Sequence, residues 1–132
     1  MARASVFVTT LMLVYEISTA VHAQARRGTG ASQPVDLVEV VGCLASASNS
    51  WQLINATDPS FAKSASTTAE SVKAAEAKQL GKKRYVLIGL NQLDPANHQG
   101  HKMAVKGLLI KDVKETRINV TSFQMASANC AK

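Results

Sequence analysis

The segment Val35–Leu44, which reads VDLVEVVGCL, constrains the fold most, because it is apolar at both alternating positions. Successive side chains of a strand point to opposite faces. One face takes Val35, Leu37, Val41 and Cys43, and the other takes Val38, Val40 and Leu44. Gly42 lies late in the segment, where a glycine marks a bend or a bulge. A bent strand that is apolar on both faces fits a small closed barrel, in which two sheets share it.

Four further segments have the composition of strands. They are Trp51–Ala56, Arg84–Leu90, His101–Ile110 and Arg117–Met125. Before the fourth strand, Asp94 and Pro95 predict a short helical turn that has Asp94 as its N-cap and ends at Gly100. This order of elements is that of an OB-fold. The sequence therefore predicts a mainly β protein, built as a five-stranded OB-like barrel.

Residues 57–83, between the second and third predicted strands, interrupt the β pattern with a stretch rich in Ala, Ser, Thr and Lys. Thr67 and Glu70 fit a capping box, and Gly81 follows as a helix stop. The apolar stripe is thin and consists of Ala69, Val72, Ala75 and Leu80. We therefore predict a helical insertion that docks only weakly on the barrel.

The last two predicted strands carry local signals of their own. Alternation places on one face Met103, Val105, Gly107 and Leu109, which we expect to point into the barrel. A glycine among them indicates the close approach of a neighbour, for which Trp51 is the candidate. Lys106 lies on the opposite face, where we expect replacement by alanine to change stability little. The apolar phase of the final strand shifts near Thr121, which predicts a β-bulge.

Residues 1–23 have the pattern of a signal peptide, with a basic residue, an apolar run and small residues at the end. Cleavage is predicted after Ala23 or Ala25. A membrane anchor is the rival interpretation, but the uncharged run is too short to cross a hydrocarbon core of about 30 Å. Residues 24–34 have the composition of a flexible linker, which leaves residues 35–130 as the folded domain. We expect a secreted or periplasmic protein with no membrane span after cleavage.

The chain holds two cysteines, Cys43 and Cys130. In an oxidising compartment they permit one intramolecular disulfide, which stabilises by roughly 4–5 kcal/mol on the chain-entropy model. The alternative is two unpaired thiols, one in a buried strand and one near the C-terminus. No Cys-x-x-Cys motif occurs, so the sequence gives no support for a thioredoxin-like redox role.

Four motifs carry a resemblance to a family. They are GCL at the first strand, W-x-L-x-N-A in the second, H-x-G-H-K-M-x-V-K-G-L-L-I, and R-I-N-V-T-S. With these motifs the chain resembles small secreted hypothetical proteins of soil bacteria such as acidobacteria, from about Val35 to Cys130. The resemblance implies an OB-like fold with a similar C-terminal cysteine, and it implies no catalytic residues. The spacing of Gly100 and Gly107 is also similar to that of periplasmic bacterial OB-fold proteins.

His98 and His101 flank Gly100 and allow two interpretations. As a turn, the segment uses the conformational freedom of glycine at the entry to a strand. As a metal site it lacks ligands, since zinc takes three or four and only Asp94 lies nearby. Met103 could serve copper, but alternation points it into the core. We favour the turn and keep a periplasmic metal-binding protein as an alternative.

The candidate ligand-binding residues are Trp51, Tyr85, Lys82, Lys83 and Arg84. Aromatic platforms beside a basic groove are what OB domains use for single-stranded nucleic acid, and the formal net charge of +6 favours acidic or polyanionic ligands. The rival interpretation is that the two aromatic side chains fill the barrel. No catalytic motif, phosphate loop or cofactor signature occurs. We therefore expect a non-enzymatic binding or interaction module without a cofactor, whose ligand and partner the sequence does not name.

Overall fold

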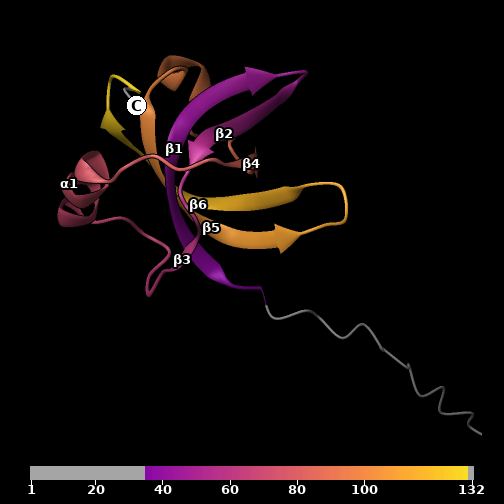
Figure 1. The fold of residues 1–132 in the computed structure, drawn as a ribbon, viewed down its shortest axis with the longest axis horizontal. Helices are drawn as coiled ribbons and strands as arrows, with labels where there is room; N and C mark the ends of the chain where they lie inside the picture. The colour runs from indigo at the N-terminus through magenta and orange to yellow at the C-terminus, as the bar shows by residue number, and fades with distance from the viewer. Residues whose placement is uncertain (1–34, 131–132) are drawn as a thin grey trace, which may run out of the picture. The chain divides into compact units, whose positions relative to one another are not determined.

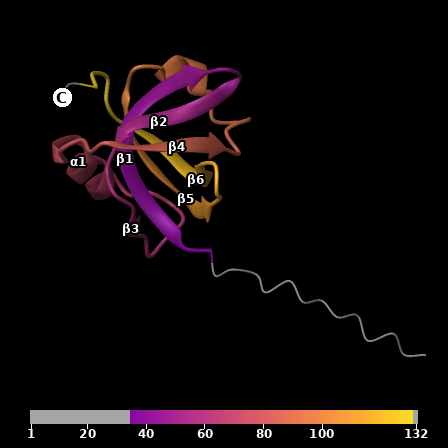
Figure 2. The same cartoon turned by 45° about the vertical axis from the view of Figure 1, so that its right-hand side comes forward.

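The computed structural model describes residues 35–130, and the predicted signal peptide and linker lie outside this range. The elements in chain order are β1 (Leu37–Ala47), β2 (Ser50–Ala56), β3 (Ser60–Phe61), α1 (Ala69–Ala77), β4 (Lys83–Ile88), the 3-10 turn η1 (Pro95–His98), β5 (Lys102–Lys111) and β6 (Thr116–Ser127). The prediction of a mainly β protein is confirmed. Figure 1 and Figure 2 show β1 as one long curved strand, with α1 outside the strands.

Five of the strands close a ring of backbone pairings. β1 pairs with β2 and β5, β2 pairs with β4, β4 with β6, and β6 with β5. The β4–β6 pair is parallel, and the other four pairs are antiparallel. We call this arrangement the strand ring. β3 is a short additional strand that pairs with β1 outside the ring.

β1 changes partners near Gly42, as its sequence suggested. It pairs with β5 from Leu37 to Cys43 and with β2 from Cys43 to Ala47. A Cβ atom on Gly42 would lie only 2.7 Å from Cγ of Leu53. Glycine is needed here because β2 folds back closely across β1. The pairing with β5 keeps its register through Gly42, so this position is a bend and not a bulge.

The predicted bulge of the last strand is present. Lys106 pairs with Ser122, but Gly107 pairs with Val120, so Thr121 is the extra residue on β6. A Cβ atom on Gly107 would lie 2.6 Å from Cγ2 of Ile118, and it would also collide with the β6 backbone. The close neighbour of Gly107 is therefore β6, and the prediction that it is Trp51 was wrong. Sequence alternation cannot identify which strand becomes the partner.

Apolar side chains from all five strands fill the strand ring. The largest of those with no more than 1 % exposure are Leu44, Leu53, Met103, Ile118, Val40 and Val105. They belong to one apolar cluster, against which Trp51 and Leu93 pack with partly buried side chains. Leu109 is in the same cluster. The predicted inward face of β5 is confirmed.

The insertion forms a helix whose ends differ from the prediction. The N-cap is Thr68, whose side chain accepts a hydrogen bond from the Ser71 N–H, so the capping box of Thr67 and Glu70 was wrong. Thr67 instead shares a hydrogen bond of 2.6 Å with Ser122 on β6. The helix ends at Ala77, well before the expected stop at Gly81. A local pattern cannot reveal that a distant strand engages Thr67.

Of the predicted apolar stripe, Ala75 is the one residue of α1 that is buried. Val41, Ala75 and Ala104 form a second buried cluster, with Leu80 and Ala126 packed against it. Small side chains at this contact let α1 approach β5 closely. The insertion therefore covers the outer side of β1 and β5.

The predicted helical turn before β5 is a single 3-10 turn. Asp94 is the N-cap and Pro95 follows it, as predicted, but Asp94 has a φ of +48° and its side chain makes no capping hydrogen bond. Its carboxylate instead accepts a hydrogen bond of 2.7 Å from the Asn97 side chain. Gly100 has a φ of +82°, as a glycine that ends such a turn requires.

Candidate functional site

Cys43 and Cys130 form a disulfide, as predicted, with their Cα atoms 5.6 Å apart and 87 residues between them in sequence. Cys43 lies where β1 passes from β5 to β2, and Cys130 lies just beyond β6. The bridge thus ties the C-terminal segment to β1 at the point where that strand changes partners.

Two buried lysines on β5 join the strand ring to the insertion. Lys106 is 6 % exposed; its ammonium lies 3.4 Å from the Glu39 carboxylate and donates to the Ser66 carbonyl at 2.8 Å. Lys102 is 7 % exposed and donates to the carbonyls of Glu76 and Lys78, both at 2.6 Å. These carbonyls belong to the C-terminal end of α1, which carries partial negative charge. The expectation that Lys106 is a surface residue was wrong, because the insertion covers it.

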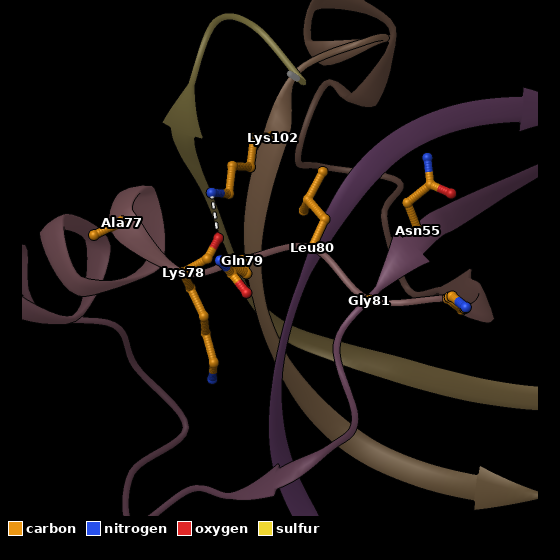
Figure 3. Close-up of a pocket in the computed structure, with 8 residues that line it drawn as sticks. Asn55, Ala77, Lys78, Gln79, Leu80, Gly81 and Lys102 are labelled. Atoms are coloured by element: carbon orange, nitrogen blue, oxygen red, sulfur yellow. Dashed lines mark hydrogen bonds between the residues drawn. The ribbon is translucent and has the colours of Figure 1, made fainter. Parts of the chain in front are cut away.

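A pocket of about 600 Å³ lies at the C-terminal end of α1. We call it the α1 pocket. It is lined by Asn55, Ala77, Lys78, Gln79, Leu80, Gly81, Lys82 and Lys102. Figure 3 shows the Leu80 side chain between those of Lys102 and Asn55, and it marks the hydrogen bond from Lys102 to Lys78. The lining thus combines an apolar side chain with amides and ammonium groups.

A second, smaller hollow of about 310 Å³ crosses the outer side of β2 and β4. We call it the β2–β4 groove. It is lined by Gln52, Arg84, Val86, Lys114, Glu115 and Thr116, the last three from the β5–β6 loop and the start of β6. Glu115 lies 3.9 Å from Arg117, so part of its charge is already compensated. The groove therefore presents a net positive surface.

The two candidate aromatic residues face the interior of the strand ring. Tyr85 is 4 % exposed, and its hydroxyl donates to the Thr57 carbonyl at 3.1 Å. Burial, helped by the negative charge of Asp58, raises the pKa of Tyr85. Trp51 is partly buried and packs against the same core. Tyr85 therefore offers no face for stacking, contrary to its assignment as a ligand-binding residue.

The structure separates the three candidate cations, which are consecutive in sequence. Lys82 lines the α1 pocket, and Arg84 lines the β2–β4 groove. Lys83 lies between them and forms an exposed ion pair with Asp58 at 3.6 Å. Lys82 precedes the first residue of β4, and alternation along β4 sends Lys83 and Arg84 to opposite sides, so the run does not form one patch. Lys102 was missed by sequence reasoning; its only signal was that it shares a strand face with a small residue, Ala104.

His98 and His101 lie at the turn that leads into β5. Their ring centroids are 5.6 Å apart, and His98 also packs edge-on against Phe123 at 5.7 Å. The Nδ1 atoms of both histidines are buried without a hydrogen-bond partner. Among the residues that the structure describes, no group of three or more His, Cys, Asp or Glu side chains could hold a metal ion. The metal-binding alternative stays a prediction, for which the two histidines are the candidate ligands.

No protein-family model, curated protein or solved structure matches the chain. The resemblance to secreted proteins of soil bacteria therefore stays a prediction. Within residues 35–130, no helix has both the length and the apolar character needed to cross a membrane.

Proposed function

We propose that this protein is a secreted or periplasmic, non-enzymatic binding module of OB-like architecture, which holds an acidic polysaccharide in the β2–β4 groove. The strand ring supports the OB-like part of the proposal, because an OB-fold is a five-stranded, partly open barrel. OB domains bind ligands on the face of their second and third strands, beside the loops between strands one and two and between strands four and five. The second and third ring strands here are β2 and β4, and the fourth and fifth are β5 and β6.

The observation that carries the proposal is the placement of Arg84 and Lys114 in that groove. Arg84 comes from β4, and Lys114 comes from the β5–β6 loop, so two separate elements bring positive charge to one hollow. Gln52 and Thr116 add groups that can form hydrogen bonds with hydroxyls. Guanidinium and ammonium groups together with such polar side chains suit a chain of sugars that carry carboxylates.

The groove suits a polysaccharide better than single-stranded nucleic acid. Binding of bases uses exposed aromatic rings for stacking, at about 1–3 kcal/mol for each base. No aromatic side chain lines the groove; Tyr85 belongs to the core on the other side of the strands, and Trp51 packs against that core with a partly buried side chain. Sugar hydroxyls and carboxylates do not require such a platform.

Export is supported by the signal-peptide pattern of residues 1–23 and by the Cys43–Cys130 disulfide. Disulfides form and persist mainly in oxidising compartments. A secreted or periplasmic module would meet acidic polysaccharides of cell envelopes and of the surroundings.

The experiment is a calorimetric titration of the chain from residue 24 onward with oligogalacturonate. We expect saturable binding that weakens as salt increases, because the contacts are ionic and near the surface. The variants Arg84→Gln and Lys114→Gln should each weaken binding, and the double variant should weaken it about tenfold or more. Lys73→Gln, an exposed charge on α1, is the matched control and should bind like the wild type.

An uncharged oligogalactan and oligo(dT) are the comparison ligands. The proposal requires that neither binds as tightly as oligogalacturonate. Tighter binding of oligo(dT) would replace the proposal with a nucleic-acid-binding module. Equal losses in the Lys73→Gln and Arg84→Gln variants would show a non-specific charge effect and overturn the groove assignment.

A further inference from the structure

Lys102 carries a buried positive charge that no negative side chain balances. The residue is 7 % exposed, and among residues 35–130 no carboxylate forms an ion pair with it. Its neighbour on the same face, Lys106, is equally buried but has Glu39 as partner. A buried ion is costly unless it is paired and hydrogen-bonded. Lys102 therefore lacks a counter-ion.

The ammonium of Lys102 keeps one donor available. A lysine ammonium has three N–H groups. Two of them are accounted for by the carbonyls of Glu76 and Lys78. These two contacts also fix the position of the ammonium, so the remaining donor needs no further ordering of the side chain. Since Lys102 lines the α1 pocket, an anion in that pocket would supply both the missing acceptor and the missing charge.

The rest of the pocket narrows the chemistry of such an anion. Asn55 and Gln79 contribute amides that can donate to and accept from hydroxyl groups. Leu80 adds a small apolar surface between Lys102 and Asn55 (Figure 3). Lys82 is exposed at the edge, where it adds positive potential without a fixed geometry. A volume of about 600 Å³ is within the range of small-molecule sites.

From these features we propose that the α1 pocket binds a small hydroxylated carboxylate of the sugar-acid class, whose carboxylate contacts Lys102. A single carboxylate matches the single buried ammonium, whereas a phosphate dianion calls for several fixed donors. The hydroxyl groups of the acid would meet the amides of Asn55 and Gln79. The pocket shares no lining residue with the β2–β4 groove, so this proposal goes beyond the proposed function and does not depend on it.

The test uses monomeric galacturonate, galactose and inorganic phosphate with the chain from residue 24 onward. Amide shifts in two-dimensional NMR spectra locate the site, and their saturation gives the affinity. We expect galacturonate to bind with a Kd of about 1 mM or tighter, and to shift the amides of Gln79, Leu80 and Gly81. Galactose, which lacks the carboxylate, should cause no saturable shift.

Three variants test whether the residues that line the α1 pocket contribute to galacturonate binding. Lys82→Gln should weaken galacturonate binding about two- to fivefold, since an exposed charge is worth up to about 1 kcal/mol. Gln79→Ala should also weaken it, and Lys102→Met should abolish it. Because Lys102→Met also loosens α1, the two exposed variants keep the test valid if that protein does not fold. Arg84→Gln is the control and should leave galacturonate binding unchanged, which separates this pocket from the groove.

The proposal is overturned if galacturonate causes no saturable shift, if galactose binds equally well, or if the shifted amides lie away from residues 79–81. Saturable binding of phosphate in place of galacturonate would also overturn it, because the ligand class would then be wrong. Loss of oligogalacturonate binding in Arg84→Gln, with unchanged galacturonate binding, supports both proposals independently.

Discussion

The strand ring and the insertion are held by different kinds of interaction. The ring encloses an apolar cluster that includes Leu44, Leu53 and Met103, all at 1 % exposure or less. The insertion has a small apolar contact around Ala75, and it depends on hydrogen bonds from Lys102 and Lys106. Apolar burial is non-directional and tolerates repacking, whereas a buried ammonium requires acceptors at defined positions. The two regions should therefore respond differently to mutation.

Leu53→Ala should have the largest effect, because Leu53 is fully buried at the centre of the ring cluster. A leucine-to-alanine change in a core costs about 2–5 kcal/mol of unfolding free energy. The measurement is urea unfolding followed by circular dichroism. Val113→Ala, at the fully exposed tip of the β5–β6 loop, is the control and should change stability by less than about 0.5 kcal/mol. A cost below about 1 kcal/mol for Leu53→Ala would mean that the ring core is loosely packed.

Gly107→Val tests a point where the backbones of β5 and β6 approach each other closely. The new side chain would collide with Ile118 and with the β6 backbone next to the bulge. We expect overpacking to cost about 1–3 kcal/mol, and we expect the bulge to shift. Thermal unfolding measures the cost. A wild-type melting temperature would show that β6 moves away freely, which would contradict the close approach.

Lys102→Met should affect the insertion and spare the ring. The change removes both hydrogen bonds to the end of α1, and hydrogen bonds to charged groups are worth about 1.5–3 kcal/mol each before the cost of burying the charge is subtracted. We expect a net loss of about 1–2 kcal/mol. Hydrogen exchange should show lost protection in α1 and retained protection in β1, β5 and β6.

Lys73→Met is the matched control for this change, since Lys73 lies exposed on the same helix. It should leave the exchange pattern of α1 unchanged. Equal loss of protection in α1 and in the ring strands for Lys102→Met would contradict the distinction between the two regions, because both would then unfold as one unit.

The sequence predicted the strand ring well because its signals are local. Alternation defined the inward face of Met103 and Val105, the glycine in VDLVEVVGCL marked the bend, and the phase shift near Thr121 marked the bulge. Each of these features depends on the order of neighbouring residues, which one sequence displays directly. β3 was missed, because two residues give no periodic pattern.

The insertion and the candidate site were predicted less well because their signals are not local. Lys102 and Lys106 have the pattern of a solvent-facing strand surface, and only a segment 24 to 40 residues away buries them. Tyr85 was assigned to ligand binding because it lies on a predicted strand directly after three cationic residues, and this local pattern does not decide which face of the strand ring it occupies. Its orientation follows from the register of β4 against β2, which pairs Tyr85 with Leu53.

Tyr85→Phe should have the smallest effect and should also connect the two regions. Tyr85 is part of the ring core, yet its hydroxyl donates to Thr57 at the start of the insertion. Loss of this buried hydrogen bond should cost about 0.5–1.5 kcal/mol at neutral pH.

The wild type should also lose stability in alkali, because burial raises the pKa of Tyr85 in the folded state above its ordinary value of 10.0. The tyrosine contribution is therefore fully present below that value and is lost as the pH rises through the higher pKa of the folded state. Phenylalanine cannot ionise, so the variant should show a smaller alkaline loss, measured by urea unfolding at a series of pH values. Equal alkaline losses in the two proteins would mean that Tyr85 ionises as readily in the folded chain as in the unfolded one, and that its hydroxyl does not hold the insertion to the ring.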